Sequence, residues 1–446
     1  MAGSLYFLLL CLQIVSSVLS NANTAGNVHH HHHHSSKTTE KSSSLEQEST
    51  NSTSGTLPIG DPTADPSHAR NTAKPTPFGF GSKVTGGGNA PPQTPKDAAE
   101  LEAWLTDKVP RVILISKTYD FSSTNTTANG CKPWKSCPNG LQVQKAMDYK
   151  EWCSKEENLA SDVTVSLVHS PLNPILVGSR KTLRGVGKSA VIKGKGLSLH
   201  LVDNIIIQNI QIDWLNPHLV WGGDGIMMDG AKNVWIDHCT FSNIGRQMIV
   251  SGGRSQIEGN TGITISNNLF SGTTKWSTRC QDRHYWVALF TGPGDEITMA
   301  RNCIDSTSGR SPKTGGSGNP KVELHYYNNL HTNTLGETFE IGKGSNVLAE
   351  GNLFKNVKIQ HPGDVVTHDG GNSYVPFRPE EASRCTSSLG RPCVANQMVE
   401  SSTYKFDLNL QAVNSFKQYP DVTKARVLPA SSLMHGVPGH CGVGFI

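Results

Sequence analysis

Asn233-Val-Trp-Ile-Asp-His-Cys-Thr-Phe-Ser-Asn-Ile-Gly-Arg-Gln247 is the stretch of this chain that decides its fold. Two apolar residues at alternate positions, Val234 and Ile236, are followed by a polar bend and by a second such pair, Cys239 and Phe241. Residues two apart in a strand point to the same face of the sheet. The stretch therefore predicts two short strands, each with one buried face, joined at the bend.

The same pattern occurs in six segments, at 204–212, 233–241, 262–270, 296–304, 321–330 and 346–354. Their corresponding bend positions are separated by 29, 29, 34, 27 and 23 residues, and are occupied by Ile210, Cys239, Asn268, Asn302, Asn329 and Asn352. A nearly constant period of strand-like segments predicts an all-β solenoid of parallel strands, in which each repeat forms one coil. The variable spacing predicts loops of different length on one side of the coils.

A doubly wound α/β fold is the alternative, but it requires amphipathic helices between the strands. Only residues 97–107 have the pattern of a clear helix, and we expect it to cover the N-terminal end of the solenoid. The four Asn residues at the bend should hydrogen-bond to one another along the stack. Cys239 takes a place in that row, which predicts a buried thiol rather than a nucleophile.

The N-terminal region predicts export from the cell. Residues 1–20 contain an apolar run followed by small residues, as in a secretory signal peptide. Residues 21–76 are rich in Ser, Thr, Gly and Pro and predict a disordered tail, in which the run His29 to His34 indicates a tag or low complexity rather than a metal site. Asn51 and Asn125 begin glycosylation motifs.

The remaining chain is expected to form one solenoid domain at 77–400 and a C-terminal extension at 401–446. A formal net charge of +4 gives no argument for nucleic acid, and no second stretch is apolar enough to cross a membrane. Six of the ten cysteines lie in loop-like sequence and suit disulfides: Cys131, Cys137, Cys153, Cys280, Cys385 and Cys393. Cys303 is expected to be a buried thiol like Cys239, and Cys441 is left without an assignment.

Charged residues in the loops between coils are the candidates for chemistry. Asp224, Arg246, Arg310 and Lys313 come from different repeats, so a solenoid brings them to one face. Taken singly, each is more simply explained as a solvated surface charge. Gly309 precedes Arg310, and a Pro follows within two residues, which favours a positioned side chain.

These residues lie in motifs that resemble the pectin lyases. The matching segments are Val234-Trp-Ile-Asp-His238, Ile244-Gly-Arg-Gln247, His284-Tyr-Trp286, Ser308-Gly-Arg-Ser-Pro-Lys313 and Phe339-Glu-Ile-Gly342, within a similarity that runs from about Gly79 to Val394. The resemblance implies a right-handed parallel β-helix with a cleft built from loops. It implies disulfides Cys131–Cys153, Cys137–Cys280 and Cys385–Cys393, and a cleft lined by the aromatic residues Trp134, Trp152, Trp221, Tyr285 and Trp286.

By position, Arg310 matches the family's catalytic Arg, and Asp224, Arg246 and Lys313 match its neighbours in the cleft. The implied reaction is β-elimination across C4 and C5 of methyl-esterified polygalacturonan, in which negative charge develops on the ester carbonyl oxygen. Fixed cations stabilise such a charge. In the calcium-dependent pectate lyases the region of Arg246 provides carboxylates for the metal, so a guanidinium there predicts no metal and no calcium requirement.

The sequence therefore predicts a secreted, monomeric endo-pectin lyase without a cofactor, acting on methyl-esterified pectin. Two alternatives stay open. One is a calcium-dependent pectate lyase, and the other is a non-catalytic solenoid that binds pectin.

Overall fold

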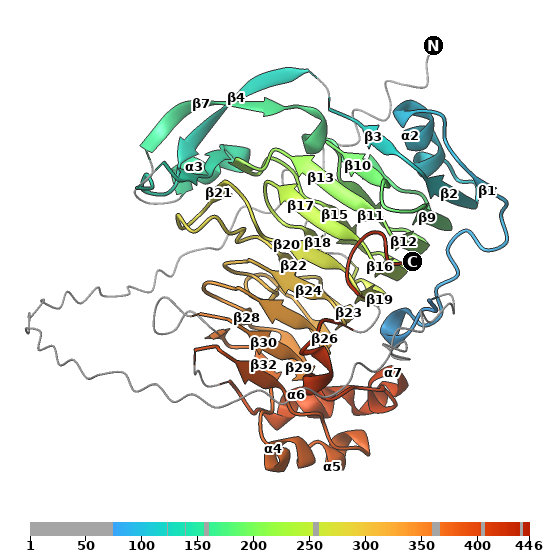
Figure 1. Cartoon of the computed structure of the whole chain (residues 1–446), viewed down its shortest axis with the longest axis vertical. Coiled ribbons are helices and arrows are strands. Elements are labelled where there is room, and N and C mark those ends of the chain that lie inside the picture. Colours follow the sequence, from blue (N-terminus) through green and yellow to red (C-terminus); the bar gives the residue numbers. More distant parts are fainter. Residues whose placement is uncertain are drawn as a thin grey trace, which may run out of the picture. The chain divides into compact units, whose positions relative to one another are not determined.

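The computed structural model of the chain describes residues 75–446, except 123, 139, 156–159, 253–257, 359–365, 403–405 and 438–439. Three long sheets of parallel strands run through this part of the chain, and each coil contributes one strand to each sheet (Figure 1). The predictions for the signal peptide, for nearly all of the 21–76 tail, for the His run and for Asn51 lie outside the described residues. None of the described helices has both the length and the apolar character that a membrane span requires.

The first sheet holds the first strand of each repeat. It contains β1 (Pro92–Gln93), β2 (Arg111–Ile115), β9 (Lys181–Gly185), β12 (Asp203–Gln208), β16 (Lys232–Asp237), β19 (Thr261–Ser266), β23 (Asp295–Ala300), β26 (Val322–Tyr327), β29 (Ser345–Glu350) and β32 (Asn372–Tyr374). Its register follows the repeat found in the sequence, because the first apolar residues of successive segments are paired: Ile205, Val234, Ile263, Ile297, Leu324 and Val347.

The second sheet holds the strands that follow the bend. It contains β3 (Thr118–Asp120), β10 (Val191–Lys193), β13 (Gln211–Leu215), β17 (Thr240–Ile244), β20 (Leu269–Ser271), β24 (Cys303–Asp305), β27 (Leu330–Thr332), β30 (Leu353–Lys355) and β33 (Gln397–Val399). The third sheet is reached after the longer loops. It contains β8 (Ile175–Leu176), β11 (Leu197–His200), β15 (Ile226–Asp229), β18 (Ile249–Ser251), β22 (Ala288–Phe290), β25 (Lys313–Thr314), β28 (Phe339–Gly342) and β31 (Val366–Asp369).

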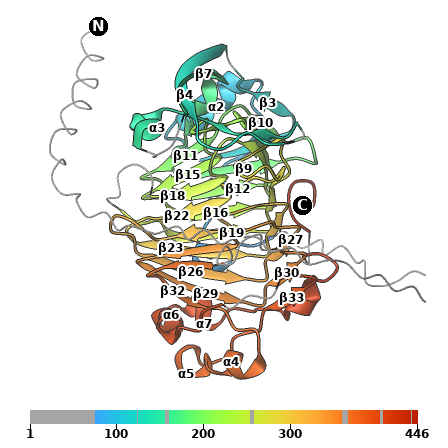
Figure 2. The same cartoon turned by 90° about the vertical axis from the view of Figure 1, so that its left-hand side faces the viewer.

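Figure 2 shows the strands stacked coil upon coil, which is the predicted single-stranded parallel β-helix. The core is a continuous column of Ile, Val, Leu and Phe side chains from all three sheets. No coil could bury its apolar face alone, so stacking is what removes this surface from water.

The predicted row of Asn residues is confirmed at the bend between the first two sheets. Asn268 donates from Nδ2 to Oδ1 of Asn302 at 3.0 Å, and Asn302 donates in the same way to Asn329 at 2.9 Å. The row continues through Asn352 to Asn396, which the sequence pattern did not reveal. Each amide also donates to a main-chain carbonyl, so polar groups that turn inward are satisfied.

Cys239 begins this row, as predicted: its main-chain N–H donates to Oδ1 of Asn268 at 2.8 Å. Its thiol is fully buried and free, and burial raises its pKa to about 12. A thiol that stays protonated at neutral pH is a poor nucleophile. Cys239 is therefore part of the scaffold.

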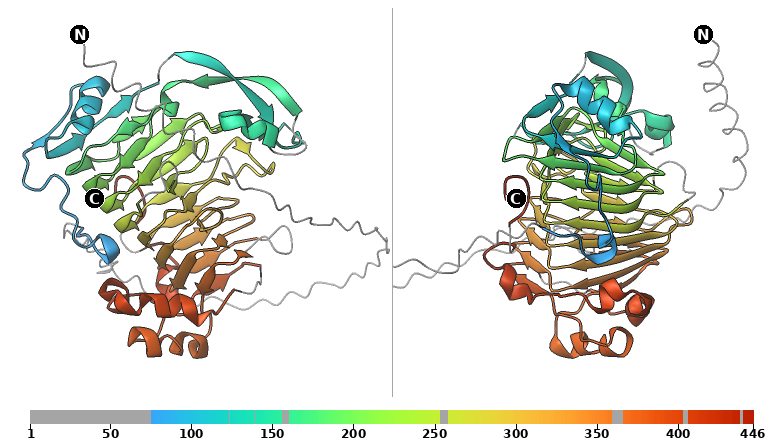
Figure 3. Two further views of the ribbon diagram at one scale, coloured as in Figure 1. Left: turned by 180° about the vertical axis from the view of Figure 1, so that it is seen from behind. Right: turned by 90° about the vertical axis from the view of Figure 1, so that its right-hand side faces the viewer.

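The predicted N-terminal helix is α2 (Ala98–Thr106). The Asp97 side chain caps it by accepting from the N–H of Glu100 at 2.8 Å, and Leu101 and Leu105 are fully buried in the central core. Figure 3 shows α2 at one end of the stack and the last helices at the other. The expectation of a single clear helix is wrong at that other end, where two short helices precede β33 and two follow it: α4 (Pro379–Ser383), α5 (Thr386–Leu389), α6 (Leu410–Ser415) and α7 (Pro420–Thr423).

These short segments lack the repeated apolar spacing of a long amphipathic helix, and packing against the last coils stabilises them instead. Ala412, Val413 and Phe416 are fully buried against Leu348 and Tyr374. The segment after residue 400 thus lies on the stack.

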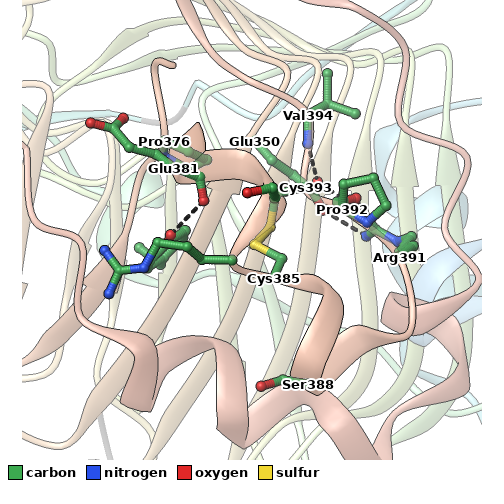
Figure 4. Close-up of a disulfide and its surroundings, with 12 residues drawn as sticks. Glu350, Pro376, Glu381, Cys385, Ser388, Arg391, Pro392, Cys393 and Val394 are labelled. Carbon is green, nitrogen blue, oxygen red and sulfur yellow. Dashed lines mark hydrogen bonds and ion pairs between the residues drawn. A yellow bond between two sulfur atoms is a disulfide. The ribbon is translucent and has the colours of Figure 1, made fainter. Parts of the chain in front are cut away.

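A buried carboxylate, Glu350, also connects several segments at this end of the stack (Figure 4). Glu350 accepts from His325 at 2.9 Å, from Arg391 at 2.7 and 3.0 Å, and from the N–H of Val394 at 2.9 Å. Burial raises the pKa of Glu350, but the hydrogen bonds from His325 and Arg391 outweigh it and lower the pKa to about 2. The Cys385–Cys393 disulfide closes the loop that carries Arg391.

The three implied disulfides are all present: Cys131–Cys153, Cys137–Cys280 and Cys385–Cys393. A fourth, Cys303–Cys441, corrects two expectations, because Cys303 is not a free thiol and Cys441 has a partner. Cys303 starts β24 with its side chain only partly buried, on the outside of the coil, where the C-terminal segment crosses it. The pairing links residues 138 apart, and the C-terminal segment has no repeat from which its path could be predicted.

The chain between β3 and β8 leaves the coil and forms a separate ribbon, which the sequence repeat did not predict. It contains β4 (Asn125–Lys132), β5 (Gln142–Val143), β6 (Lys145–Met147), α3 (Trp152–Lys155) and β7 (Ala160–Val168). β4 pairs antiparallel with β6 and β7, and β6 pairs with β14 (Leu219–Val220) from a loop of the solenoid. β5 pairs with β21 (Trp276–Ser277) of another loop, so this ribbon is tied to the loops that carry the candidate residues.

Candidate active site

The candidate residues lie where the chain enters the third sheet. Asp224 and Arg246 directly precede β15 and β18, Trp286 precedes β22, Arg310 precedes β25, and Lys313 begins β25. Because β15, β18, β22 and β25 are successive neighbours in one sheet, four coils present these side chains at one edge. The predicted convergence follows from this register.

Arg246 lies between a carboxylate and an aromatic ring. Its Nη1 donates to Oδ2 of Asp224 at 2.8 Å, and its guanidinium carbon lies 4.0 Å from the ring centroid of Trp221. The other oxygen of Asp224 accepts from the N–H of Gln247 at 2.9 Å. The side chains of Arg246 and Asp224 are 15% and 12% exposed, so this charge pair is held in a fixed place.

Arg310 is held by aromatic rings rather than by a tight ion pair. Its guanidinium lies 4.5 Å from the ring centroid of Trp286 and 5.6 Å from that of Tyr285, and Glu340 is 3.7 Å from its Nε. Within the part of the chain that the structure describes, Nε of Arg310 has no hydrogen-bond partner. The residue before it must be glycine, because a Cβ on Gly309 would lie 2.2 Å from the Tyr285 ring.

Two carboxylates that the sequence reasoning missed complete this cluster. Lys313 donates to Oε2 of Glu340 at 2.6 Å, and the Tyr285 hydroxyl lies 2.8 Å from Glu340 and 3.0 Å from Glu337. Lys313 and Glu340 are paired in register on β25 and β28. The repeat could have found Glu340, because it lies one period of 27 residues after Lys313, the same spacing as between two of the bend Asn residues.

The pKa values of Glu337 and Glu340 are shifted in opposite directions. Burial and the neighbouring Glu340 raise the pKa of Glu337 to about 7. Burial acts the same way on Glu340, but the charges of Arg310 and Lys313 outweigh it and lower its pKa. Glu340 is therefore the ionised partner of the two cations. Burial, together with the negative charges of Glu340 and Glu337, raises the pKa of the Tyr285 hydroxyl, which stays protonated.

The predicted aromatic residues are brought together around Trp286. Trp134, Trp152, Trp221 and Tyr285 pack with it in one cluster that also contains the Cys131–Cys153 disulfide. The Trp286 indole N–H donates to Oε1 of Gln144 at 3.0 Å, which fixes the ring beneath Arg310. Tyr149, whose ring centroid is 5.0 Å from that of Trp221, was not among the predicted residues.

Two histidines are structural. His238, at the bend after β16 of the first sheet, is hydrogen-bonded to Asp237 at 2.8 Å. His284 lies within hydrogen-bonding distance of the main-chain oxygens of Arg246 (2.9 Å) and Trp286 (3.0 Å), and burial lowers its pKa to about 4. A neutral His284 therefore ties together the loops that carry the two residues.

The part of the chain that the structure describes contains no group of three or more His, Cys, Asp or Glu side chains arranged to hold a metal ion. At the place where the resemblance puts calcium ligands, both oxygens of Asp224 are already engaged by Arg246 and Gln247. The residues present do not fit a divalent cation there, because a guanidinium fills the position that the ion would need.

Comparison with known proteins agrees with the geometry. A family model described as pectate lyase matches residues 167–406. Probable pectin lyase F of Aspergillus flavus is 44% identical over 331 residues, which are 73% of this chain and 74% of that protein. Probable pectin lyase F of Aspergillus niger is 39% identical over 375 residues (83% and 75%), and pectin lyase B of Emericella nidulans is 40% identical over 344 residues (75% and 87%).

Among solved structures, a pectate lyase bound to a hexasaccharide matches 83% of this chain and 97% of its own, with a TM-score of 0.51 and 16% identity. A mutant of the Bacillus subtilis pectate lyase matches with the same coverage, a TM-score of 0.50 and 16% identity. This likeness bears on the fold and confirms the right-handed parallel β-helix.

Proposed function

Because the chain belongs to the pectate lyase family, we propose that it is a secreted pectin lyase that cleaves methyl-esterified polygalacturonan by β-elimination. The observation that carries the proposal is Arg246, a guanidinium fixed on Asp224 in the cluster that also holds Arg310 and Lys313. The site then works through protein cations alone, without calcium or another cofactor. The pectin lyases named above are similar over most of the chain, which supports the same choice of substrate.

Binding is proposed to rest on the aromatic cluster. A methyl-esterified galacturonan carries no charge on the esterified sugars, so ion pairs contribute little to its binding. The flat apolar faces of sugar rings can instead stack on Trp and Tyr rings, which bind apolar surface and still offer polar edges. Trp134, Trp152, Trp221, Tyr285 and Trp286 are the proposed lining of the cleft.

The proposed chemical step transfers the C5 proton of one sugar to Arg310, which must enter the step as a neutral guanidine because a guanidinium has no site for a further proton. The C5–H bond breaks, a C4–C5 double bond forms, and the C4–O bond to the neighbouring sugar breaks. The departing oxygen takes a proton from water, and the hydroxide that remains takes the proton back from Arg310. Negative charge develops on the ester carbonyl oxygen on the way. Arg246 and Lys313 are proposed to stabilise it, since preorganised cations in a partly dry site act on developing charge without reorganising.

Glu340 and Asp224 have positioning roles in this scheme. Each holds one of the cations in place: Lys313 at 2.6 Å and Arg246 at 2.8 Å. Four disulfides in the described residues suit an oxidising compartment and support secretion. The site uses residues of one chain, so a monomer is sufficient for activity.

The test uses purified protein with highly methylated pectin and with polygalacturonate, each with and without a chelator, followed by ultraviolet absorbance of unsaturated ends. We expect activity on the methylated polymer that the chelator does not change. Activity confined to polygalacturonate and abolished by the chelator would mean a calcium-dependent pectate lyase. A bound polymer with no increase in absorbance would mean a binding module.

The role of Arg310 is tested by Arg310→Ala, which should abolish turnover and leave the fold intact. Arg301→Ala is a matched control, because Arg301 also has a left-handed backbone (φ 58° against 43°) and lies over an aromatic ring, Phe78 at 5.0 Å. Arg301 stands beside the Asn row, not at the third sheet, so its loss should leave activity near that of the wild type. If Arg310→Ala keeps most of its activity, the assignment of the proton acceptor is wrong.

A further inference from the structure

A hollow of about 400 Å³ opens among residues that the proposed chemistry does not use. Its walls come from the ribbon and from the solenoid loops paired with it, and include Gln142, Lys145, Val165, His218, Leu219 and Trp276. Most of these side chains offer apolar surface, while Lys145 and Gln142 offer a charge and an amide. This combination suits a ligand with flat apolar faces and anionic groups.

The hollow is separate from the cleft aromatics. The side chain of Gln144, between Val143 and Lys145 in the sequence, is fully buried and bonds Trp286 and the main-chain oxygen of Gly245. Its two neighbours line the hollow instead. Gln144 thus fixes an aromatic ring of the cleft, while Val143 and Lys145 on either side of it line the hollow.

A pair of tryptophans marks this place. Trp214 is 41% exposed, and its ring stands edge-on to that of Trp276, with the centroids 6.2 Å apart. His218 lies 5.8 Å from the same Trp276 ring. The Trp276 indole N–H donates to Oε1 of Gln142 at 2.7 Å, so the ring is fixed rather than loosely attached.

The backbone at Trp214 is the strongest sign of a function. It is the last residue but one of β13, at a corner where the coils turn toward the loops, and its φ is +61°. Six residues at the same corner of other coils are also left-handed, but they are small or polar: Gly194, Asn243, Ser306, Asn333, Asn356 and Glu400. Glycine and asparagine adopt this conformation readily, whereas a bulky residue there is an outlier. The corner after β3 carries Phe121, which is partly buried against the core and is not left-handed. Among the corners that the structure describes, a large exposed ring on a left-handed backbone therefore occurs at Trp214, and such strain is a reason to look for function.

The charge of Lys145 indicates which ligand fits. Its side chain is exposed and makes no ion pair with the residues described in the structure. Beside the Trp276 indole and the Gln142 amide, which line the same hollow, an unpaired ammonium favours a sugar chain with carboxylates over a neutral one.

We propose that Trp214, Trp276, His218 and Lys145 form a second binding site for a galacturonan chain, distinct from the catalytic cleft. The site holds stretches of the polymer that carry free carboxylates while the cleft acts on esterified stretches. The inference rests on the proposed function for the identity of the polymer.

Trp214→Asn and Lys145→Gln test the site. Asparagine occupies the same corner in other coils, so Trp214→Asn should unfold at the same or a higher temperature than the wild type. Its affinity for polygalacturonate, measured by native electrophoresis in gels that contain the polymer, should fall roughly three- to tenfold, as expected for the loss of one aromatic contact. Lys145→Gln should weaken binding to polygalacturonate more than binding to highly methylated pectin.

Phe445→Ala is the matched control, because it removes another exposed ring (49%) far along the sequence and should leave both affinities unchanged. The kcat of Trp214→Asn on a short methylated oligogalacturonide should equal that of the wild type. Unchanged affinity for polygalacturonate in both Trp214→Asn and Lys145→Gln overturns the second site, whatever the activity. A wild type that cleaves neither polymer overturns the proposed function instead, and the binding assay still decides on the site.

Discussion

Replacing Arg246 with glutamine is the sharpest test of a guanidinium in the place of a metal ion. The substitution leaves Asp224 with its hydrogen bond from Gln247 but without the charge 2.8 Å away. Removing one partner of a buried ion pair costs about 3–5 kcal/mol, because the other charge stays buried without compensation. Since both side chains here keep some contact with water, we expect a loss of about 2–4 kcal/mol in the free energy of unfolding.

The same change removes one of the cations proposed to stabilise the developing charge. Losing one preorganised donor of this kind typically lowers kcat by about 10²–10³, or roughly 2.7–4 kcal/mol. The esterified substrate is neutral before reaction, so the missing charge affects the transition state more than substrate binding. Arg246→Gln should therefore reduce kcat by about that factor on methylated pectin, with a smaller change in KM.

The double variant Asp224→Asn with Arg246→Gln separates the two effects. It removes the uncompensated charge of Asp224, so the urea concentration at the midpoint of unfolding should return toward the wild-type value. The kcat, measured by absorbance, should stay low. A single Arg246→Gln variant that keeps more than about a third of the wild-type kcat would refute the role of this charge. Recovery of kcat together with stability in the double variant would show that Arg246 acts only on the fold.

Three further predictions concern the scaffold and the carboxylates beneath the site. The pKa of Glu337 is raised to about 7, against 4.5 for a free side chain, so the folded state favours the protonated carboxyl. The free energy of unfolding should therefore fall as the pH rises from about 4.5 to 7. Urea unfolding at pH 5 and at pH 8 should show this decrease in the wild type and not in Glu337→Gln. Cys441→Ser opens a link between residues 138 apart and should lower the free energy of unfolding by at most about 5 kcal/mol, with no further loss when Cys303 is also replaced by Ser. Asn329→Ala leaves buried amide partners unsatisfied, each worth about 1–3 kcal/mol, and should lower the unfolding midpoint in proportion without affecting KM.

The repeat made the coil predictable because its physical cause is local. Each segment needs two apolar residues on one face, a bend and a second pair, so Val234 and its counterparts identify the register without any knowledge of distant contacts. Asn268 and the three Asn residues after it could be placed for the same reason. Asn396 could not, because its segment, before the short strand β33, lacks the repeated pattern.

Contacts made by segments outside the repeat could not be predicted from the sequence. The pairing of Cys303 with Cys441, and the tie between β5 and β21, both join segments whose spacing carries no period. Glu340 is a different case. Its register with Lys313 follows from the period, but its role comes from the charges around it, which emerge only when Arg310 and Tyr285 are placed.

The balance of charge at the site explains why a neutral ester suits it. Arg246 and Lys313 carry two positive charges, and Asp224 and Glu340 offset both of them. In the form that accepts the C5 proton, Arg310 adds no charge of its own. As Arg310 takes that proton it becomes positive while negative charge develops on the ester oxygen, so the two charges appear together only as the transition state forms. A free carboxylate would bring its negative charge to Arg246 and Lys313 before reaction. Binding would then tighten in the ground state as well, which lowers KM without raising kcat. A calcium site would instead bring two positive charges to meet a carboxylate that is already present. A site whose fixed charges are balanced before reaction therefore favours substrates whose own charge appears during the reaction, and the ester is such a substrate.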